Sequence, residues 1–350
     1  SVRRLIDEGP FTASDARARG LLDTLLAEAD VDSLAAHQGG ERFSLGSLTR
    51  YAEEGGGGSG ERIALLVAEG EIISGKSREG AFGGRSVGDA TLVEALREIR
   101  QRHNIRAVVL RIDSPGGSGD ASDAVWQEIR RVRRDKPVIV SMGDVAASGG
   151  YYLACAGDVI VAGPATITGS IGVFGGKLNV LGLYQKLGLN VETVSRGKHA
   201  EMLSPFKDFS DEELARYQQS LDQFYRVFLS RVATGRKMDP AVIDSVGQGR
   251  VWSGVQAKAR GLVDELGGLQ EAFELARTRA KIDPDADIVV EVYPRPRKTL
   301  VQRWLGGVLE EPDNEEARLP GLAAFGHWYE MATMPAGRVQ ALMPYTIEIR

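Results

Sequence analysis

The chain has 350 residues, of which 43% are hydrophobic and 26% charged, so it is long and apolar enough to bury one or two globular cores. Its formal net charge is −5 at pH 7, and most predicted helices mix both signs of charge, which argues against a nucleic-acid partner. The main local exception is a run of arginines on a predicted helix, which is typical of a solvated face: Arg130, Arg131, Arg133 and Arg134. The single cysteine, Cys155, lies in an apolar stretch and is predicted to be a small core residue.

A stretch of sequence that occurs twice, here called the echo, gives the first evidence on domain organisation. Residues 11–25 read FTASDARARGLLDTL, and residues 252–266 read WSGVQAKARGLVDEL. A helix–turn motif used twice would explain the shared alanine and leucine positions, but not the shared Arg-Gly-Leu-x-Asp. The echo therefore predicts a two-repeat protein in which residues 1–52 are the end of a truncated first repeat. We expect the chain to begin within a longer protein, and it shows neither a signal peptide nor an apolar run of the roughly 20 residues that span a bilayer.

A linker is predicted at residues 53–60, which contain four consecutive glycines. After it, short runs rich in β-branched residues alternate with amphipathic stretches. This alternation is typical of a mainly parallel sheet with crossover helices, so we expect an α/β fold for residues 61–282. Strands are expected at residues 62–67, 106–112, 137–142 and 159–162, and helices at residues 89–101, 120–133 and 148–156.

The apolar spacing becomes helical after Ser210, which is predicted to cap a helix because Glu213 follows three residues later, as in a capping box. Helices are expected to dominate up to Ile282. A strand is predicted at residues 288–293, and the rest of residues 283–350 forms a tail without a clear period. The aromatic residues of the tail are expected to pack on the body of the protein, and contact with a membrane interface is the alternative.

Three glycine-containing segments follow predicted strands, where α/β folds place their sites. The first, residues 113–118, reads DSPGGS. Its two adjacent glycines lack Cβ atoms and can turn backbone N–H groups into a cleft, as an oxyanion hole requires. A plain turn would explain this segment equally well.

The second segment, residues 143–152, reads GDVAASGGYY and places Ser148 at the start of a predicted helix. At such a position the serine hydroxyl can face a ligand near the positive end of the helix dipole. Serine is also a favoured N-cap, so simple capping is the structural alternative. The third segment, residues 165–173, reads ATITGSIGV, and its hydroxyl residues would either bond a catalytic group or build a turn.

In this order and at this spacing, the three segments resemble the signature of the signal peptide peptidase A family, a branch of the Clp-protease and crotonase-like fold. The resemblance runs from about residue 62 to 282. It implies Ser148 as the nucleophile, backbone N–H groups of Gly117 and Gly149 as the oxyanion hole, and Ser170 as the hydroxyl that orients the base. The resemblance also implies a Ser/Lys dyad, in which a neutral lysine amine replaces the histidine of a triad.

The lysine is where this sequence departs from the family pattern. In short, single-repeat relatives the base would stand at the position of Ala200, whose side chain cannot accept a proton. In long, two-repeat relatives the lysine comes from the first repeat, so we expect the base upstream of this chain, with Lys198 as the alternative. A Ser-His-Asp triad has little support, because none of the four histidines lies within the three segments: His37, His103, His199 and His327.

The resemblance also implies a substrate and a setting. We expect cleavage of apolar, membrane-derived peptides such as released signal peptides, by a homo-oligomer at the periplasmic face of the bacterial inner membrane, anchored through a segment upstream of this chain. No cofactor or metal is implied. Two other functions stay open: a crotonase-like acyl-CoA enzyme, which would not need Ser148, and a non-catalytic pseudo-protease repeat that only binds peptides.

Overall fold

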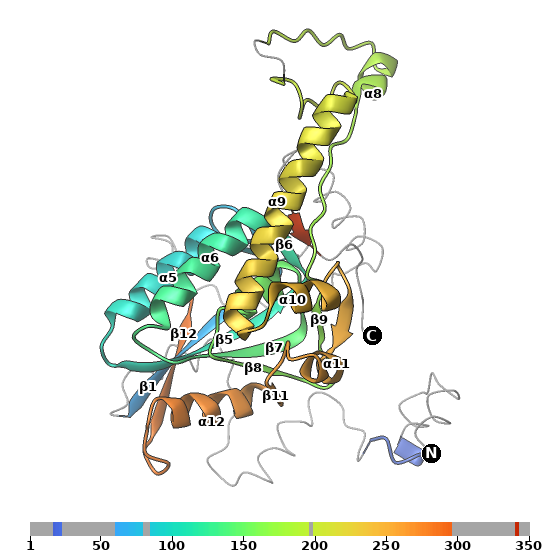
Figure 1. Ribbon diagram of the computed structural model, residues 1–350. Coiled ribbons are helices and arrows are strands. Elements are labelled where there is room, and N and C mark those ends of the chain that lie inside the picture. Colours follow the sequence, from blue (N-terminus) through green and yellow to red (C-terminus); the bar gives the residue numbers. More distant parts are fainter. Residues whose placement is uncertain (1–16, 23–59, 80–84, 196–198, 296–339, 343–350) are drawn as a thin grey trace. The chain divides into compact units, whose positions relative to one another are not determined.

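The structure is a computed structural model that describes residues 17–22, 60–79, 85–195, 199–295 and 340–342 (Figure 1). The chain divides into two units, Ser1–Gly57 and Gly58–Arg350. All strands, and all helices longer than one turn, that are described below belong to the second unit. No helix among the described residues is long and apolar enough to cross a membrane.

The second unit is built on a sheet that has eight strands in the described part of the chain, in the order β10-β9-β7-β5-β1-β12, with β8 beside β7 and β11 beside β8. All its pairs are parallel except β9 with β10, which confirms the prediction of a mainly parallel α/β fold. The strands are β1 (Glu61–Glu69), β5 (Ile105–Ser114), β7 (Val138–Ala147), β8 (Val159–Ala162), β9 (Ile167–Gly169), β10 (Val251–Ser253), β11 (Glu265–Leu266) and β12 (Ile288–Tyr293). Because β12 pairs with β1, this unit extends past residue 282.

Helices cover both faces of this sheet (Figure 1). Successive side chains of a strand point to opposite faces, and on β1 Ala64 and Leu66 belong to one core cluster while Ile63 and Leu65 belong to the other. The larger cluster packs under α5 (Asp89–Gln101), α6 (Gly119–Val132), α7 (Gly149–Ala154) and the second half of α9 (Asp211–Arg236), and the smaller one under α12 (Leu269–Arg279). Cys155 lies in the larger cluster, as expected.

A second, five-stranded sheet has the order β13-β6-β2-β4-β3. It was not predicted, because strands of two to four residues carry no measurable period. Its strands are β2 (Glu71–Ile73), β3 (Arg78–Glu79), β4 (Arg85–Gly88), β6 (Gly116–Ser118) and β13 (Gln340–Leu342). Strand β6 comes from the predicted DSPGGS segment, so this segment is more than a turn.

The chain between β9 and α9 projects from the body and carries the short helix α8 (Leu181–Lys186), as Figure 1 shows. The predicted capping box at the start of α9 is present, because Ser210 accepts the backbone N–H of Glu213 and the Glu213 carboxylate accepts the N–H of Ser210. After α9 come α10 (Pro240–Val246) and α11 (Gly254–Ala259). The arginine run on α6 is only partly a solvated face: Arg131 and Arg134 are exposed, whereas Arg133 bonds Asp158.

The two copies of the sequence echo share their local backbone where both are described. Gly20 and Gly261 stand at matching positions, and each has φ of 72°. Gly20 N–H donates to the carbonyl of Arg17 at 3.0 Å, and Gly261 N–H donates to the matching Lys258 at 3.1 Å. A left-handed residue that ends a helix is usually glycine, so the shared glycine has a conformational reason in both copies.

A buried carboxylate ties the edge strand β12 to the body. Glu291 accepts hydrogen bonds from Arg62 on β1, from Arg102 at the end of α5 and from Arg295. Burial raises the pKa of a carboxyl, but here the hydrogen bonds from Arg102 and Arg62 outweigh it and lower the pKa of Glu291 to about 2.

We expect this cluster to make stability depend on pH. A carboxyl whose pKa is lowered on folding stabilises the protein above its unfolded pKa, and this contribution is lost as the pH falls toward the folded value. The unfolding free energy of Glu291→Gln should therefore lie well below that of the wild type above pH 4.5 and approach it toward pH 2. Denaturant unfolding across this range measures the difference, and a gap that does not change with pH would contradict the assignment.

Candidate active site

The structure brings the second and third sequence segments together at the end of two neighbouring strands. In the parallel pair of β7 and β9, Ala147 is opposite Gly169, so Ser148 and Ser170 are the next residues on strands that lie about 4.8 Å apart. Ser148 N–H donates to the carbonyl of Gly169 at 2.9 Å. Both serines are almost fully buried, with 1% and 2% of their surface exposed.

Threonines of the third segment join it to the second. Thr166 Oγ1 donates to the carbonyl of Gly143 at 2.8 Å, and Thr168 Oγ1 donates to the carbonyl of Ala146 at 2.7 Å. Both hydroxyl protons are therefore donated to backbone carbonyls. Ser170 is the remaining serine or threonine of the segment whose hydroxyl can act on a catalytic group, in keeping with the role that the family resemblance implied.

The first segment is joined to the second through an irregularity in the sheet. Ile112 of β5 is opposite Met142 of β7, but Ser114 is opposite Ala146, so β7 carries two extra residues at this point. The carboxylate of Asp113 accepts the N–H of Val145 inside this bulge, at 3.1 Å. Burial is the largest influence on Asp113 and raises the pKa of its carboxyl. A bulge of this kind redirects the end of a strand. Here it directs the end of β7 toward the Ser148 turn.

Ser148 occupies a backbone conformation that L-residues rarely adopt. It has φ of 52° and ψ of −113° between the end of β7 and the first residue of α7. A non-glycine residue at positive φ costs about 1–3 kcal/mol, and such strain clusters at functional sites. The prediction that the helix starts at residue 148 was wrong by one residue. The capping alternative is not supported, because the Ser148 side chain makes no cap hydrogen bond.

The hydroxyl of Ser148 is buried and has no hydrogen-bond partner among the described residues. Buried polar groups in proteins are almost always bonded, and leaving one unsatisfied costs about 1–3 kcal/mol. A strained serine with an unbonded hydroxyl at a strand-to-helix turn has the arrangement that exposes a nucleophile to a substrate.

Two tyrosines hold the turn in place. Tyr151 O–H donates to the carbonyl of Leu262 at 2.8 Å, and burial raises the pKa of this phenol. Tyr152 O–H donates to Asp123 at 2.7 Å, and Arg231 donates to the same carboxylate. The sequence segment contained both tyrosines, but their partners lie 29 and 111 residues away, too far for a local pattern to reveal.

The first two segments approach each other closely at their glycines. A Cβ on Gly150 would be 2.8 Å from the carbonyl oxygen of Ser114, so the start of α7 packs directly on the DSPGGS segment. Gly149, the first residue of α7, has an N–H that no intrahelical carbonyl can accept. Gly117 lies on β6 with φ of 151°, and a Cβ there would be 2.1 Å from the carbonyl oxygen of Ile72. Gly117 is therefore required by the packing of β6 on β2, whatever its N–H does.

The edge of β6 opposite β2 is able to pair with an extended chain. β13 pairs antiparallel with it, with Ala341 opposite Gly117. The backbone of β6 is therefore able to form a ladder with an added strand on this edge.

No described lysine is hydrogen-bonded to Ser148. Lys177 donates to the carbonyl of Met202 at 2.7 Å, and burial lowers the pKa of its amine, so it is less solvated than its polar position predicted. Lys136 is buried, which sequence reasoning missed, and burial lowers its pKa as well. Lys136, however, lies before the first residue of β7, whereas Ser148 lies after its last residue. Because a ten-residue strand spans about 33 Å, Lys136 is too far away to act on Ser148. Lys198, the alternative base, lies outside the described residues.

The histidines do not build a triad in the part of the chain that the structure describes. His199 lies 3.4 Å from Glu212 in the projecting segment, and His103 is exposed after α5. His37 and His327 lie outside the described residues. No group of three acidic, histidine or cysteine side chains that could hold a metal occurs among the described residues.

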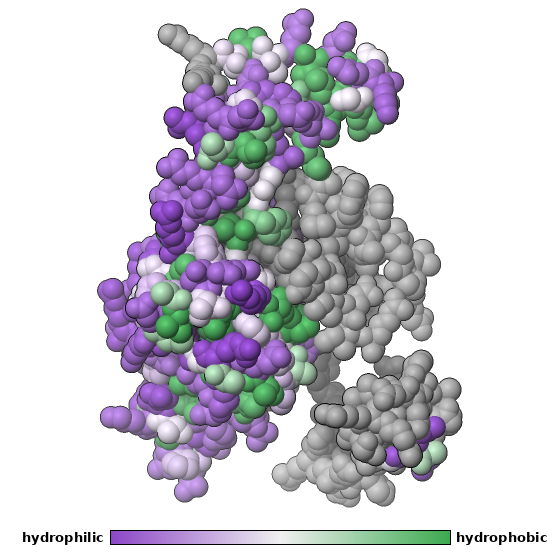
Figure 2. Space-filling model, turned by 45° about the vertical axis from the view of Figure 1, so that its right-hand side comes forward, coloured by the Kyte–Doolittle hydropathy of each residue, from purple (hydrophilic) through white to green (hydrophobic). Residues whose placement is uncertain are grey.

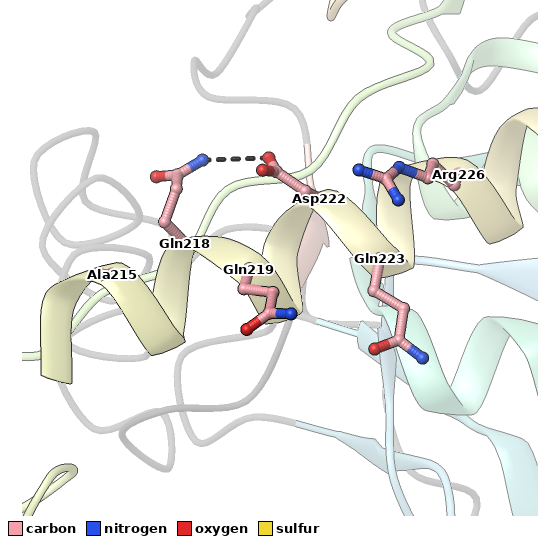
Figure 3. Close-up of a pocket in the computed structure, with 6 residues that line it drawn as sticks. All are labelled: Ala215, Gln218, Gln219, Asp222, Gln223 and Arg226. Carbon is pink, nitrogen blue, oxygen red and sulfur yellow. Dashed lines mark hydrogen bonds between the residues drawn. The ribbon is translucent and has the colours of Figure 1, made fainter. Parts of the chain in front are cut away.

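A pocket of about 400 Å³ lies along α9, away from these residues (Figure 3). The side chains that line it come from this one helix, and Gln218 donates to Asp222 at 3.1 Å within it. None of these side chains is a serine, threonine, cysteine or lysine, so we do not place the nucleophile there. The lining residues are Ala215, Gln218, Gln219, Asp222, Gln223 and Arg226.

Comparisons with known proteins agree with this geometry. The Peptidase family S49 model matches residues 130–283, and the Clp protease model matches residues 86–162. Serine protease SPPA, chloroplastic, of Arabidopsis thaliana is 38% identical over 76% of this chain, and Protease 4 of Salmonella typhi is 37% identical over 79%. A protein of Enterococcus faecium named "Putative signal peptide peptidase SppA" is 31% identical over 73% of each chain.

These matches and the geometry define a Clp-protease-like α/β fold of the serine peptidase class. The chain belongs to peptidase family S49, the family of signal peptide peptidase A and protease 4. It spans 42% and 45% of the lengths of the Arabidopsis and Salmonella relatives, less than half of each.

The strain at Ser148 can be measured by comparing two substitutions. Ser148→Ala keeps a Cβ at positive φ, whereas Ser148→Gly removes it and also removes the conformational penalty. Although glycine usually destabilises folded proteins, we expect Ser148→Gly to be more stable than Ser148→Ala by about 1 kcal/mol. Denaturant unfolding of both variants measures this, and an alanine variant that is the more stable of the two would show that the turn is unstrained.

A second pair of variants tests the packing of Gly117 on β2. We expect Gly117→Ala to lower the unfolding temperature by several degrees, because its Cβ would overlap the backbone of Ile72. Gly176→Ala is the control, since a Cβ there has no atom within 4 Å. If Gly117→Ala unfolds at the wild-type temperature, β6 is not packed on β2 as described.

Proposed function

We propose that the whole protein is a serine endopeptidase of the Ser/Lys dyad type that cleaves apolar, membrane-derived peptides, such as released signal peptides, through an acyl-enzyme on Ser148. The observation that carries the proposal is the Ser148 turn, where a strained residue holds a buried hydroxyl without a partner among the described residues. A residue with only a structural role would gain nothing from this conformation.

In the proposed mechanism Ser148 Oγ attacks the peptide carbonyl carbon while a neutral lysine amine takes the hydroxyl proton. The carbonyl oxygen becomes an oxyanion that accepts hydrogen bonds from the N–H groups of Gly117 and Gly149. The C–N bond then breaks, and the lysine ammonium returns its proton to the leaving amine. Water, deprotonated by the same lysine, attacks the ester carbonyl, the bond from this carbon to Ser148 Oγ breaks, and the lysine ammonium returns the proton to Oγ. Ser170 orients the lysine amine throughout.

The base in this proposal comes from the upstream repeat. A solvated lysine is protonated at neutral pH, and desolvation lowers its pKa so that it can act as a base. Lys177 bonds the carbonyl of Met202 and Lys258 bonds Glu265, so neither amine is engaged at Ser148. This chain spans less than half of its long relatives. A repeat that covered Ser148 and Ser170 would deliver a lysine and exclude water in one step.

The peptide backbone is proposed to bind on the edge of β6 opposite β2, in place of β13. Residues 340–342 pair with this edge, and addition of a strand is a common way to bind extended peptides. By its family relation the protein is proposed to work as a homo-oligomer at the periplasmic face of the inner membrane, anchored outside the described residues.

The proposal is tested with the protein that includes the upstream repeat. We expect Ser148→Ala to reduce hydrolysis of an apolar peptide amide by at least about 10³-fold without unfolding the protein. The 350-residue chain alone should fold and show negligible turnover from mildly acidic to alkaline pH.

Three results would contradict parts of this reading. Unchanged turnover in Ser148→Ala would contradict the assignment of Ser148 as the nucleophile and favour a crotonase-like enzyme. Failure of a serine-directed phosphonate to label the wild type would favour a peptide-binding pseudo-protease. Robust amide hydrolysis by the 350-residue chain that disappears in Lys198→Ala would make Lys198 the base.

A further inference from the structure

Ser170, the residue proposed to orient the base, has a strained backbone like that of Ser148. Its φ is 47°, in the left-handed region that favours glycine, and its side chain is almost fully buried. A non-glycine residue persists in this conformation only where the surrounding structure holds it. The contacts around Ser170 therefore decide where its hydroxyl lies.

The loop between α10 and β10, residues 247–250, holds the backbone at Ser170. Ser170 N–H donates to the carbonyl of Arg250 at 2.8 Å, and Gly249 N–H donates to the carbonyl of Ile171 at 2.9 Å. These two bonds continue the antiparallel pairing of β9 with β10 past the ends of both strands. A shift of the 247–250 loop would therefore move Ser170 with it.

The loop is itself strained, and a side chain from α9 bonds it at that point. Gln248 and Gly249 are both left-handed, with φ of 57° and 75°, and glutamine has no preference for this conformation. The hydroxyl of Tyr225 accepts the N–H of Gln248 at 3.0 Å and donates to the carboxylate of Asp244 on α10 at 2.7 Å. Burial, together with the bond to Asp244, raises the pKa of Tyr225 to about 12, so the hydroxyl keeps the proton that it donates.

Tyr225 lies on the half of α9 that packs against the body. The first half extends along the projection, where Figure 2 shows a largely hydrophilic surface. In the second half, the rings of Phe224 and Phe228 lie 6.2 Å and 4.6 Å from that of Tyr152, between ring centres. Tyr152 N–H in turn donates to the carbonyl of Ser148 at 2.8 Å. One stretch of α9 therefore contacts the segments that hold both serines.

We propose that Tyr225 is a positioning residue, whose hydroxyl fixes the 247–250 loop and, through this loop, the place of the Ser170 hydroxyl beside the base. The inference rests on the role of Ser170 in the proposed function. The competing explanation is that the Tyr225 hydroxyl only joins α9 to α10 and stabilises the fold.

Hydrogen exchange in the 350-residue chain tests the contact itself. Tyr225→Phe removes one hydroxyl and keeps the ring, so we expect the amides of Gln248 and Ser170 to exchange about 10-fold faster through local opening. Tyr217→Phe is the matched control, because it makes the same change on the same helix, at a hydroxyl that has no hydrogen-bond partner among the described residues. Unchanged exchange in Tyr225→Phe would overturn the proposal.

Kinetics of the protein that includes the upstream repeat test the role in catalysis. Tyr225→Phe should lower kcat for an apolar peptide amide by about 10-fold and leave KM unchanged, because a displaced orienting group weakens the transition state alone. In a Ser170→Ala background the same change should alter kcat by no more than about twofold, since Tyr225 acts through Ser170. Equal losses in the two backgrounds would assign Tyr225 a structural role and overturn the proposal.

The single variants separate this inference from the proposed function. A wild-type rate in Ser170→Ala would contradict the role of Ser170 and overturn both. A loss in Ser170→Ala with a wild-type kcat in Tyr225→Phe would overturn the inference alone. Tyr217→Phe should keep the wild-type kcat.

Discussion

The pairing of β7 with strands on both sides is the constraint on which the candidate active site depends. β5 and β9 flank its second half, and the bulge opposite Asp113 sets the direction in which the strand ends. Since Ala147 is locked opposite Gly169, the next residue on each strand is a serine, and the two serines must lie close together. Backbone ladders therefore fix the spacing of the site before any catalytic group is considered.

The strained turn at Ser148 can persist because its surroundings are firmly packed. Tyr151 and Tyr152 are fully buried, and each ends in a hydrogen bond to a distant segment. Burying an aromatic side chain of this size stabilises a fold by about 1.5–3 kcal/mol, which is comparable to the cost of one residue at positive φ. The paired tyrosines after the Gly-Gly therefore offset the strain that aims the serine hydroxyl.

Much of the fold could be predicted, since buried parallel strands are continuous apolar runs and α5 has a clear helical period at the predicted residues, 89–101. The continuation of β7 through Gly143 was missed, because glycine and aspartate resemble a turn there until Asp113 supplies its long-range hydrogen bond. The candidate site residues were predicted from the combination of three segments, as each alone had a simpler explanation. The roles of Thr166 and Thr168 could not be assigned from sequence, because either hydroxyl could bond the backbone or a catalytic group.

A nucleophile and its base on different repeats would couple chemistry to assembly. On its own, the chain would hold a strained serine whose hydroxyl has nothing to take its proton, so a free unit would not hydrolyse the peptides around it. A repeat that covered Ser148 and Ser170 would also shield the lysine from water, and this desolvation would lower the pKa of its amine toward neutral pH.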